Sequence, residues 1–354
     1  MKNRYFRYIL RHFVIWNIAF IFWGLMREFG QEVVQDFDPI TFSQRLRLHL
    51  VIGIVSGLLF GSLDYFIERK VFKHVSLGKA MLIGLTSFTV VVLLLLTFAM
   101  RAFTRIAGLE FNWDTYSDFM FSNEMLLLVF YFFLIAFLAD IFKQIDKKLG
   151  PGNLWRMIIG KFYQPKEDER IFMFLDLKSS TSIAEKIGHI KYSKLIQDCF
   201  KDLHVVEKYH AEVYQYVGDE VVLTWSREIG LADSNCLRAF FEFRKKLVDK
   251  ADYYMKKYGV IPEFKAGLNI GKIVVAEVGE IKTEIAYHGD TINTAARIQE
   301  QCNILKRSLL ISEKLKTSLM LDSGFASDHV GDILLKGKSS KVNIYSVDVS
   351  RAYS

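Results

Sequence analysis

Long apolar runs fill the first 142 residues of the chain, and shorter runs of alternating apolar and polar residues follow them. A helix that spans a bilayer needs about 20 mainly apolar residues. The stretches 80–100 and 125–142 meet this need with almost no charge, and 13–26 and 50–67 meet it if polar side chains near the helix ends reach the membrane surface. The pattern predicts a four-helix transmembrane domain, residues 1–142, with spans at about 8–27, 48–67, 79–100 and 122–142.

Basic residues indicate on which side of the membrane the connecting segments lie. The N-terminus, the segment 68–79 and the exit after the last span are rich in Lys and Arg, whereas 27–47 and 101–124 are acid-rich. Short cytoplasmic segments collect Lys and Arg, so we expect the N-terminus and the soluble region in the cytoplasm. No small-residue cleavage site follows the first apolar run, which argues against a secretory signal peptide.

The second predicted span carries Gly53, Gly57 and Gly61 on one helix face. Small residues at this spacing allow close helix packing, either within the bundle or at a dimer seam. Four polar side chains in or near the spans are either interfacial groups or parts of a ligand, proton or haem site: His12, His49, Asp64 and Asp140.

Residues 143–168 are expected to form a short coupling segment between the membrane domain and the soluble domain. Gly-Pro-Gly at 150–152 breaks the helix that leaves the membrane, and 153–163 is apolar at helical spacing and ends before Pro165. A flexible solvated linker would be more polar than this.

Composition narrows the function of the soluble part. The chain has 354 residues, of which 51% are hydrophobic and 24% charged, and its net charge is +7. This basic excess is too small and too evenly spread to indicate nucleic-acid binding. The three cysteines, Cys199, Cys236 and Cys302, lie in the soluble part without a CxxC pair, as suits a reducing cytosol.

The soluble region, residues 169–350, begins with a carboxylate in an apolar strand. In "RIFMFLDLKSST", Asp176 interrupts a run of large apolar residues. Burying its charge is costly unless a Lys, an Arg or a metal ion compensates it. The polar residues that follow suit a turn into a helix N-terminus, where free backbone N–H groups attract phosphate: Ser179, Ser180 and Thr181.

A second carboxylate lies at the tip of a predicted hairpin, "EVYQYVGDEVVLT", which turns at Gly218 and Asp219. If this hairpin lies beside the strand of Asp176, the two aspartates approach each other and repel. Divalent cations that bridge such a pair make it tolerable, and paired oxygen-ligated metals serve displacement at phosphorus. Glu220 is interpreted as a turn residue beside the site.

Two further stretches carry polar residues suited to a nucleotide. In "HGDTINTAARIQEQCN", Asn293 and Arg297 stand four residues apart and share one helix face. An amide and a guanidinium there suit an ether oxygen and a developing phosphoryl charge, although such pairs are often merely solvated. In "LLKGKSSKVNIYSV", Lys336 and Lys338 flank a glycine and form either a polyphosphate clamp or a basic surface turn.

These motifs resemble the class III nucleotidyl cyclases, the adenylate and guanylate cyclase catalytic domain. The resemblance covers about 170–348 and rests on "FLDLKSST", "YVGDEV", "GDTINTAAR" and "LKGK" in that order. It implies an α+β, ferredoxin-like fold with an antiparallel sheet and helices on one face, and the helical stretches 181–209 and 229–258 agree with it. It also implies a bacterial-type enzyme that makes a 3′,5′-cyclic mononucleotide and pyrophosphate, and the predicted spans place it in the inner or plasma membrane.

By position, the resemblance assigns roles to the candidate residues. Asp176 and Asp219 would bind two Mg or Mn ions with help from the Leu177 carbonyl. Asn293 would orient the ribose, and Arg297 would stabilise the transferring phosphoryl group. The backbone amides of Ser179, Ser180 and Thr181 would contact the triphosphate, and Lys336 would hold its terminal phosphates, with Lys338 as the other candidate of the clamp. Family members dimerise head to tail, so the aspartates of one protomer meet Asn293 and Arg297 of its partner, and an unknown ligand or regulator would act on the membrane domain.

The sequence departs from the family where the base is bound. The position of Gln215 usually carries Lys in adenylate cyclases and Glu in guanylate cyclases, and that of Ala286 usually carries Asp or Thr for adenine and often Cys for guanine. Gln215 can donate or accept by flipping its amide, whereas Ala286 offers no polar contact. ATP is the expected substrate, mainly because adenylate cyclases dominate bacterial examples of the family, and GTP is the alternative.

Other interpretations remain open. A diguanylate cyclase carries Gly-Gly-Asp-Glu-Phe on a related hairpin, but the glycine pair is missing from "VGDEV". A degenerate cyclase domain would serve a membrane receptor as a nucleotide-sensing dimerisation module. Function could also lie in the membrane half, as a ligand receptor or a transporter with the cyclase as its output. Four short spans leave little room for the polar pathway that a transporter needs.

Overall fold

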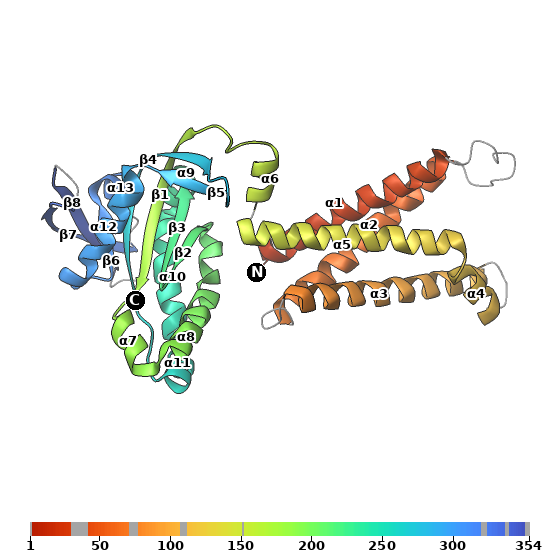
Figure 1. The fold of residues 1–354 in the computed structure, drawn as a ribbon, viewed down its shortest axis with the longest axis horizontal. Helices are drawn as coiled ribbons and strands as arrows, with labels where there is room; N and C mark the ends of the chain where they lie inside the picture. Colours follow the sequence, from red (N-terminus) through yellow and green to blue (C-terminus); the bar gives the residue numbers. More distant parts are fainter. Residues whose placement is uncertain are drawn as a thin grey trace. The chain divides into compact units, whose positions relative to one another are not determined.

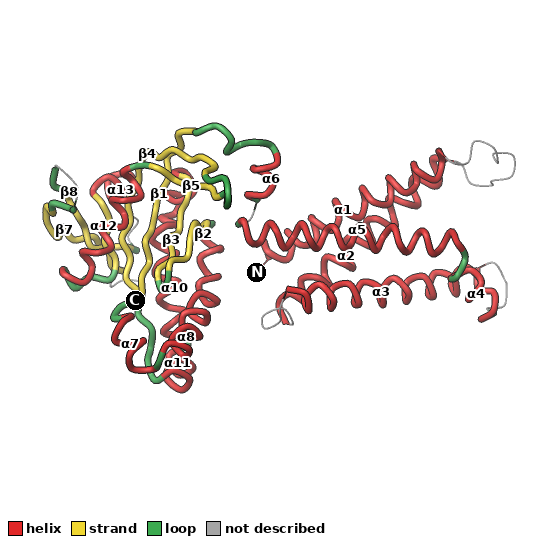
Figure 2. The backbone as a smooth tube through the Cα atoms, in the orientation of Figure 1, coloured by secondary structure: helices red, strands yellow, loops and turns green. Residues whose placement is uncertain are grey.

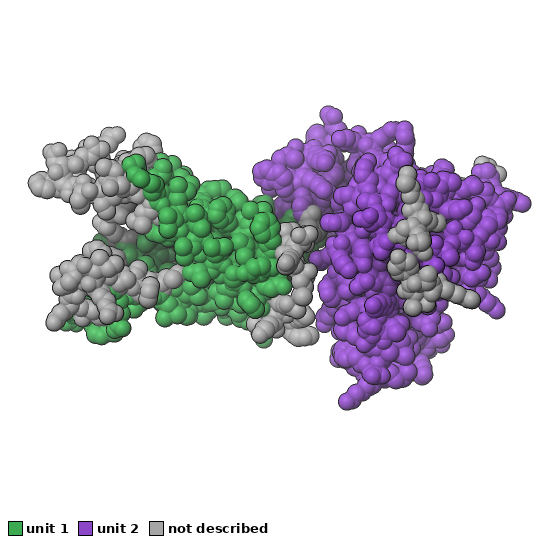
Figure 3. Space-filling model, turned by 180° about the vertical axis from the view of Figure 1, so that it is seen from behind, with its two compact units in different colours: residues 1–148 green, residues 149–354 purple. Residues whose placement is uncertain are grey.

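The computed structural model describes residues 2–29, 42–70, 77–106, 112–150, 152–319, 324–336 and 340–350. The chain divides into two compact units, residues 1–148 and 149–354 (Figure 3). The described part of the first unit is helical, and the second unit is built around a β-sheet.

Five helices make up the described part of the first unit (Figure 1): α1 Lys2–Phe29, α2 Phe42–Lys70, α3 Leu77–Ile106, α4 Trp113–Met120 and α5 Asn123–Leu149. Three helical stretches in its described residues are long and apolar enough to cross a membrane: Tyr8–Met26, His49–Glu68 and Met125–Leu149. The fourth predicted span, 79–100, lies within α3, in which the described residues include the apolar stretch Leu82–Leu94.

The glycines of α2 bring it against the backbone of α1. A Cβ atom added at Gly57 would lie 2.6 Å from the Cα of Phe13, and one at Gly61 would lie 2.9 Å from the Cα of Ile9. Gly53 makes the same kind of approach. The glycine face is therefore used for packing within the bundle, one of the two roles that its spacing indicated.

An ion-paired cluster joins α1, α2 and α5. Asp64 on α2 contacts Arg11 at 2.8 Å, His12 at 3.1 Å and Lys143 at 2.7 Å. Lys143 also lies 3.2 Å from Asp140. Three of the four polar groups that the sequence singled out in this region are thus members of one set of mutual ion pairs.

The described part of the second unit begins with α6 Asn153–Ile158 and contains eight strands. The strands are β1 Lys166–Leu177, β2 Glu212–Val217, β3 Glu220–Ser226, β4 Phe264–Val278, β5 Glu284–His288, β6 Leu309–Ser312, β7 Phe325–Ile333 and β8 Val342–Val349. The helices are α7 Ser180–Ile187, α8 His189–Asp202, η3 Leu203–Tyr209, α9 Arg227–Leu231, η4 Ala232–Ser234, α10 Asn235–Val248, α11 Ala251–Tyr258, α12 Asp290–Ile304 and α13 Glu313–Ser318. The expected helical stretch 181–209 is divided at Gly188, whose φ of 80° suits glycine.

The strands form one mixed sheet in the order β2-β3-β1-β4-β6-β8-β7, and β5 pairs with the end of β4 (Figure 2). Paired strands are antiparallel except β4 and β6, which are parallel. Strands β1 to β4 with α8 and α10 follow the strand and helix order of a ferredoxin-like fold. The expected α+β fold is therefore confirmed.

Side chains of the central strands alternate between two cores. Met173 and Leu175 enter the larger core, which includes residues of α8, η3, α10 and α11. Phe172 enters a second core that contains Ala295 of α12. The expectation that the helices cover one face was wrong for α12, because the later β5-α12-β6 connection crosses the opposite face. Asp176 shares that face with Phe172, and this places it beside α12.

The coupling segment is anchored to the second unit by its apolar side chains. Phe162 is 6% exposed and lies in the core on the α12 side, where Met157, Tyr214 and Tyr287 pack. The backbone N–H of Glu277 donates to the carbonyl of Phe162 at 3.0 Å. The later part of the segment, 152–168, is therefore packed on this unit, whereas 143–148 continue α5 in the first unit.

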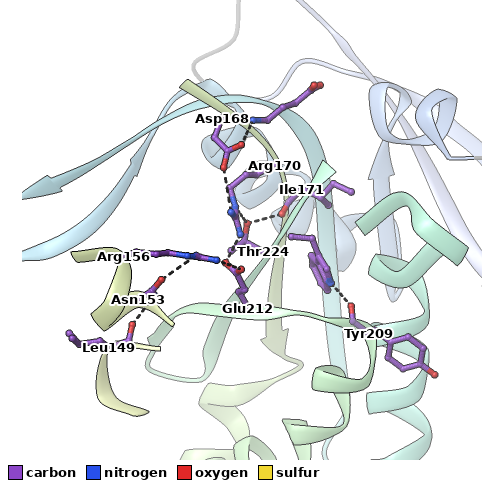
Figure 4. Close-up of polar contacts among 11 residues, drawn as sticks. Leu149, Asn153, Arg156, Asp168, Arg170, Ile171, Tyr209, Glu212 and Thr224 are labelled. Atoms are coloured by element: carbon purple, nitrogen blue, oxygen red, sulfur yellow. Dashed lines mark hydrogen bonds and ion pairs between the residues drawn. The ribbon is translucent and has the colours of Figure 1, made fainter. Parts of the chain in front are cut away.

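Polar contacts extend this anchor to the β2-β3 hairpin (Figure 4). Arg156 of α6 lies 3.9 Å from Glu212 at the start of β2. Arg170 of β1 donates to the same carboxylate at 2.6 Å and to the hydroxyl of Thr224 at 3.0 Å. Since Arg170 also lies over the ring of Tyr287, at 5.3 Å, it connects the hairpin, β1 and β5.

Candidate active site

The two aspartates singled out by the sequence lie together at one end of the sheet. Strands β1 and β3 pair antiparallel, and Asp176 stands opposite Glu220. Asp219 occupies the preceding position, in the two-residue turn after β2. Its charge helps to raise the pKa of Asp176, after burial, which is the larger cause, and against the opposing effect of Lys265. The hairpin therefore lies beside β1 in the arrangement that brings both carboxylates together.

A lysine supplies part of the compensation for Asp176. The Nζ atom of Lys265, on β4, lies 3.1 Å from Asp176 Oδ2, and its side chain is only 7% exposed. Gln299 of α12 donates from Nε2 to the same oxygen at 3.0 Å. Of the two compensations that the sequence left open, a basic side chain is thus present.

One lysine does not balance the acidic groups around it. Burial first, and then the charges of Asp176 and Asp219, raise the pKa of Glu220 to about 7. Asp219 Oδ2 is buried and has no hydrogen-bond partner among the described residues. Such an oxygen is costly to bury unless something binds it. The residues present therefore fit a divalent cation, which would contact the aspartates and relieve their repulsion.

The aspartates alone would not complete the coordination of a metal ion. In the part of the chain that the structure describes, no three His, Cys, Asp or Glu side chains are arranged as a metal-binding group. Hard cations such as Mg²⁺ take six oxygen ligands and commonly share them between carboxylates, water and the phosphates of a substrate. Leu177 has a fully buried side chain in the larger core, so only its backbone carbonyl is suited to such a role.

The predicted phosphate-binding turn follows β1 directly. Ser179 has a φ of 55° and precedes α7, which begins at Ser180, and Thr181 is exposed in its first turn. Behind this turn lies Tyr192 of α8. Burial first, and then the charge of Asp219, raise the pKa of Tyr192 to about 12, so its hydroxyl stays protonated at neutral pH. The turn and the acidic pair are thus neighbours.

Helix α12 presents the predicted amide and guanidinium. Its entry is at Gly289, where the φ of 149° favours glycine. Asn293 is exposed, and Arg297 donates to Glu300 at 2.8 Å from a side chain that is 35% exposed. Both side chains are therefore accessible to a partner molecule. In this protomer Asp176 is contacted by Gln299 of the same helix, two residues beyond Arg297.

The two predicted base-binding positions each adjoin a tyrosine in the chain, and these two tyrosines contact each other. Gln215 is exposed on β2 and Ala286 is half-buried on β5. Their chain neighbours Tyr214 and Tyr287 stack edge to face with ring centroids 4.8 Å apart. The fold thus brings the two strands together although they belong to different hairpins.

Of the two predicted phosphate-binding lysines near the C-terminus, the structure describes one. Lys336 is exposed in the turn after β7. Lys338 lies outside the described residues.

Sequence reasoning missed three polar residues at this site: Tyr192, Lys265 and Gln299. Lys265 offered a signal, since it interrupts the apolar strand "FKAGLNIG" as Asp176 interrupts its own strand. The two are register partners on adjacent strands. Gln299 and Tyr192 offered none, because each looks like an ordinary helix residue until the helices are placed on the sheet.

Comparison with known proteins identifies the second unit. The family model for the adenylate and guanylate cyclase catalytic domain matches residues 162–348. A bacterial light-regulated adenylyl cyclase has a similar fold, with a TM-score of 0.55, 18% identity, and coverage of 64% of this chain and 67% of that chain.

Two curated relatives resemble the same region. Adenylate cyclase 2 of Rhizobium meliloti is 33% identical over 205 residues, which are 58% of this chain and 56% of that protein. A receptor-type guanylate cyclase of Caenorhabditis elegans is 22% identical over 214 residues, with coverage of 54% of this chain and 18% of that protein. The similarity therefore spans about half of the first relative and less of the second.

Proposed function

This chain belongs to the adenylate and guanylate cyclase catalytic domain family, and we propose that it is a membrane-anchored adenylate cyclase that makes a second messenger under control of its membrane domain. The observation that carries the proposal is the pair Asp176 and Asp219, with an unpaired buried oxygen on Asp219. Such a pair suits divalent cations that hold a nucleoside triphosphate.

The reaction joins the ribose 3′-oxygen to the α-phosphorus of ATP. The bond between the α-phosphorus and the bridging oxygen breaks, pyrophosphate leaves, and the proton of the 3′-hydroxyl passes to water. Two bound Mg or Mn ions would supply charge that lowers the pKa of the hydroxyl and shields the triphosphate. Asn293 would orient the ribose, and Arg297 would stabilise the charge that develops on the transferring phosphoryl group.

The site is completed by a second protomer. In the head-to-tail dimer that the family resemblance implies, the acidic pair of one protomer meets Asn293 and Arg297 of the other. The accessibility of both side chains on α12 supports this arrangement. The contact of Asp176 with Gln299 also supports it, because within one protomer Asp176 contacts Gln299 of α12 and leaves Asn293 and Arg297 to the other protomer.

The membrane domain, residues 1–142, would act through the coupling segment, 143–168, on the catalytic domain, 169–350. Three helical stretches of sufficient length and apolarity support membrane anchoring, and the apolar stretch of α3 would supply the fourth span. The basic connecting segments favour a cytoplasmic catalytic domain at a bacterial inner membrane. The anchored position of Phe162 supports the coupling role, since its neighbours lie on the strands of the base pocket.

ATP is favoured over GTP by the 33% identity with an adenylate cyclase, compared with 22% for the receptor-type guanylate cyclase. The direct test gives ATP and GTP together with Mn²⁺ to detergent-purified full-length protein and analyses the products by mass spectrometry. Cyclic AMP is the expected main product. Cyclic GMP as the main product would reverse the base assignment, and the absence of any cyclic mononucleotide would overturn the enzyme proposal.

A further inference from the structure

The buried amide of Gln299 connects two parts of the active-site machinery within one protomer. We infer that Gln299 is a positioning residue for the metal-binding carboxylate of Asp176, and that it couples the metal site to the helix that carries Asn293 and Arg297. The inference rests on the proposed function and adds a residue to it.

The contact itself is well suited to orient a carboxylate. Gln299 Nε2 donates to Asp176 Oδ2 at 3.0 Å, and Lys265 Nζ lies 3.1 Å from the same oxygen. Gln299 is 5% exposed and Lys265 is 6% exposed, so water competes little for either contact. Hydrogen bonds to a charged group are about twice as strong as those between neutral groups. Because both donors use Oδ2, these two contacts leave Oδ1 to a bound cation.

The backbone of Gln299 is fixed as firmly as its side chain. A Cβ atom added at Gly267 of β4 would lie 2.2 Å from the backbone nitrogen of Gln299 and 2.6 Å from its Cα. Helix α12 therefore lies directly on β4 at this point. Lys265 and Gly267 are two residues apart on β4 and share one face, so Lys265, Gln299 and Asp176 meet where helix and sheet are in closest contact.

The choice of an amide follows from the charges around it. Asp176, its register partner Glu220 and the preceding residue Asp219 already place three carboxyl groups close together. A glutamate at position 299 would add a further carboxylate beside Asp176. Glutamine instead donates a hydrogen bond without adding charge.

This contact joins two different sites of the dimer. Arg297 lies two residues before Gln299, about 3 Å along the helix axis. In the head-to-tail arrangement Arg297 serves one active site, whereas Asp176 of the same protomer serves the other. A change in the position of Asp176 on metal binding would therefore be passed by Gln299 to the helix that acts in the second site.

The first experiment measures metal binding without turnover. Full-length protein in detergent is titrated with Mn²⁺ in the presence of 3′-deoxy-ATP, which lacks the attacking hydroxyl, and thermal stabilisation is followed. Gln299→Leu should need about tenfold more Mn²⁺ for half-maximal stabilisation. Gln299→Met provides a second apolar variant, and Gln301→Leu, two residues along the same helix, is the matched control and should behave as the wild type.

An unchanged Mn²⁺ requirement in both Gln299 variants would overturn the inference alone, since the wild-type response would still stand. No Mn²⁺-dependent stabilisation in the wild type would overturn the proposed function and the inference together.

The second experiment separates the two sites. A mixture of Asp219→Ala and Arg297→Ala protomers has one working site, with its acidic pair from the Arg297→Ala protomer. Gln299→Leu placed in that protomer should raise the Mn²⁺ requirement. Placed in the Asp219→Ala protomer, it should lower kcat and leave the Mn²⁺ requirement unchanged, because it then affects only the helix that presents Arg297. An unchanged kcat in this second case would overturn the coupling between the sites.

Discussion

Asp176 on β1 stands directly opposite Glu220 on β3, one residue from the turn carboxylate of Asp219. Antiparallel pairing places opposed side chains on the same face of a sheet, so the register puts the carboxyl groups of Asp176 and Glu220 on the face that α12 covers. Lys265, the register partner of Asp176 on the other side, offsets only part of this charge. This excess of carboxylates at the hairpin tip supports the proposal that a cation binds there.

Neutralising the turn carboxylate should separate function from folding. Asp219→Asn should lower cyclic nucleotide formation at least about a hundredfold, because a metal ligand is lost. In the absence of divalent cations its thermal midpoint should be equal to that of the wild type or higher, because the repulsion of Asp176 is relieved. Thermal unfolding and product analysis check this. The exposed Asp249→Asn is the control, and retained activity in Asp219→Asn would contradict the metal role.

Base preference should follow the polar groups placed at two positions. Gln215→Lys with Ala286→Asp should raise the ratio of cyclic AMP to cyclic GMP by at least about tenfold, because Lys donates to adenine N1. Gln215→Glu with Ala286→Cys should lower the ratio similarly, because Glu accepts from the N–H groups of guanine. Both nucleotides are supplied together and the products are separated by mass. Equal ratios in the two double variants would place base recognition elsewhere.

Hydrophobic pattern was sufficient to predict β1, the β2-β3 hairpin and the apolar helices, because each is a local property of the chain. The approach of Asp219 to Asp176 followed from one assumption, that the hairpin lies beside β1. The contact between Gln299 and Asp176 joins residues 123 positions apart and depends on which face α12 covers. That face is set by the close contact of α12 with Gly267, which local pattern does not encode.

Acid should weaken the contact between α8 and α11. Partial burial acts to raise the pKa of Asp198, but hydrogen bonds from Lys257, Tyr253 and Tyr258 together hold the pKa well below its ordinary value. A lowered pKa adds stability above the ordinary value of 3.8, and this stability is lost as the pH falls below it. Asp198→Asn should therefore lower stability at pH 7 by about 1–2 kcal/mol. Its stability should fall less than that of the wild type between pH 5 and 3.

Denaturant unfolding at several pH values tests this expectation. Asp249→Asn again serves as the control, since Asp249 is exposed. Parallel pH curves for Asp198→Asn and the wild type would show that Asp198 is not the responsible group.

Removal of residues 1–142, the proposed membrane domain, should change the catalytic properties of the chain. A chain lacking residues 1–142 should differ from the full chain in kcat or in the fraction of dimer, because the bundle is expected to set the relative orientation of the two catalytic domains. Enzyme kinetics and light scattering, both made in the same detergent, measure the two quantities. Unchanged kinetics and an unchanged fraction of dimer would contradict control of the catalytic domain by the bundle.

The coupling segment provides a more local test, because two adjacent aromatic residues in it differ in burial. Phe162 is 6% exposed, whereas Tyr163 is 82% exposed. Phe162→Ala should lower stability by about 3 kcal/mol, and Tyr163→Ala should have little effect. Phe162→Leu, which leaves a smaller cavity, should keep the fold and still alter kcat/KM, since Phe162 packs in the core that contains Tyr214 and Tyr287.

These tyrosines adjoin Gln215 and Ala286 in the chain, so a shift of the segment would reach the proposed base-binding positions through packed rings. The expected result is that Phe162→Leu changes the KM for ATP in the full chain, with the thermal midpoint within a few degrees of the wild type. If Phe162→Leu and Tyr163→Ala gave the same KM as the wild type, the segment would be a passive anchor. A changed KM for Phe162→Leu alone would support control of the proposed base-binding positions by the coupling segment.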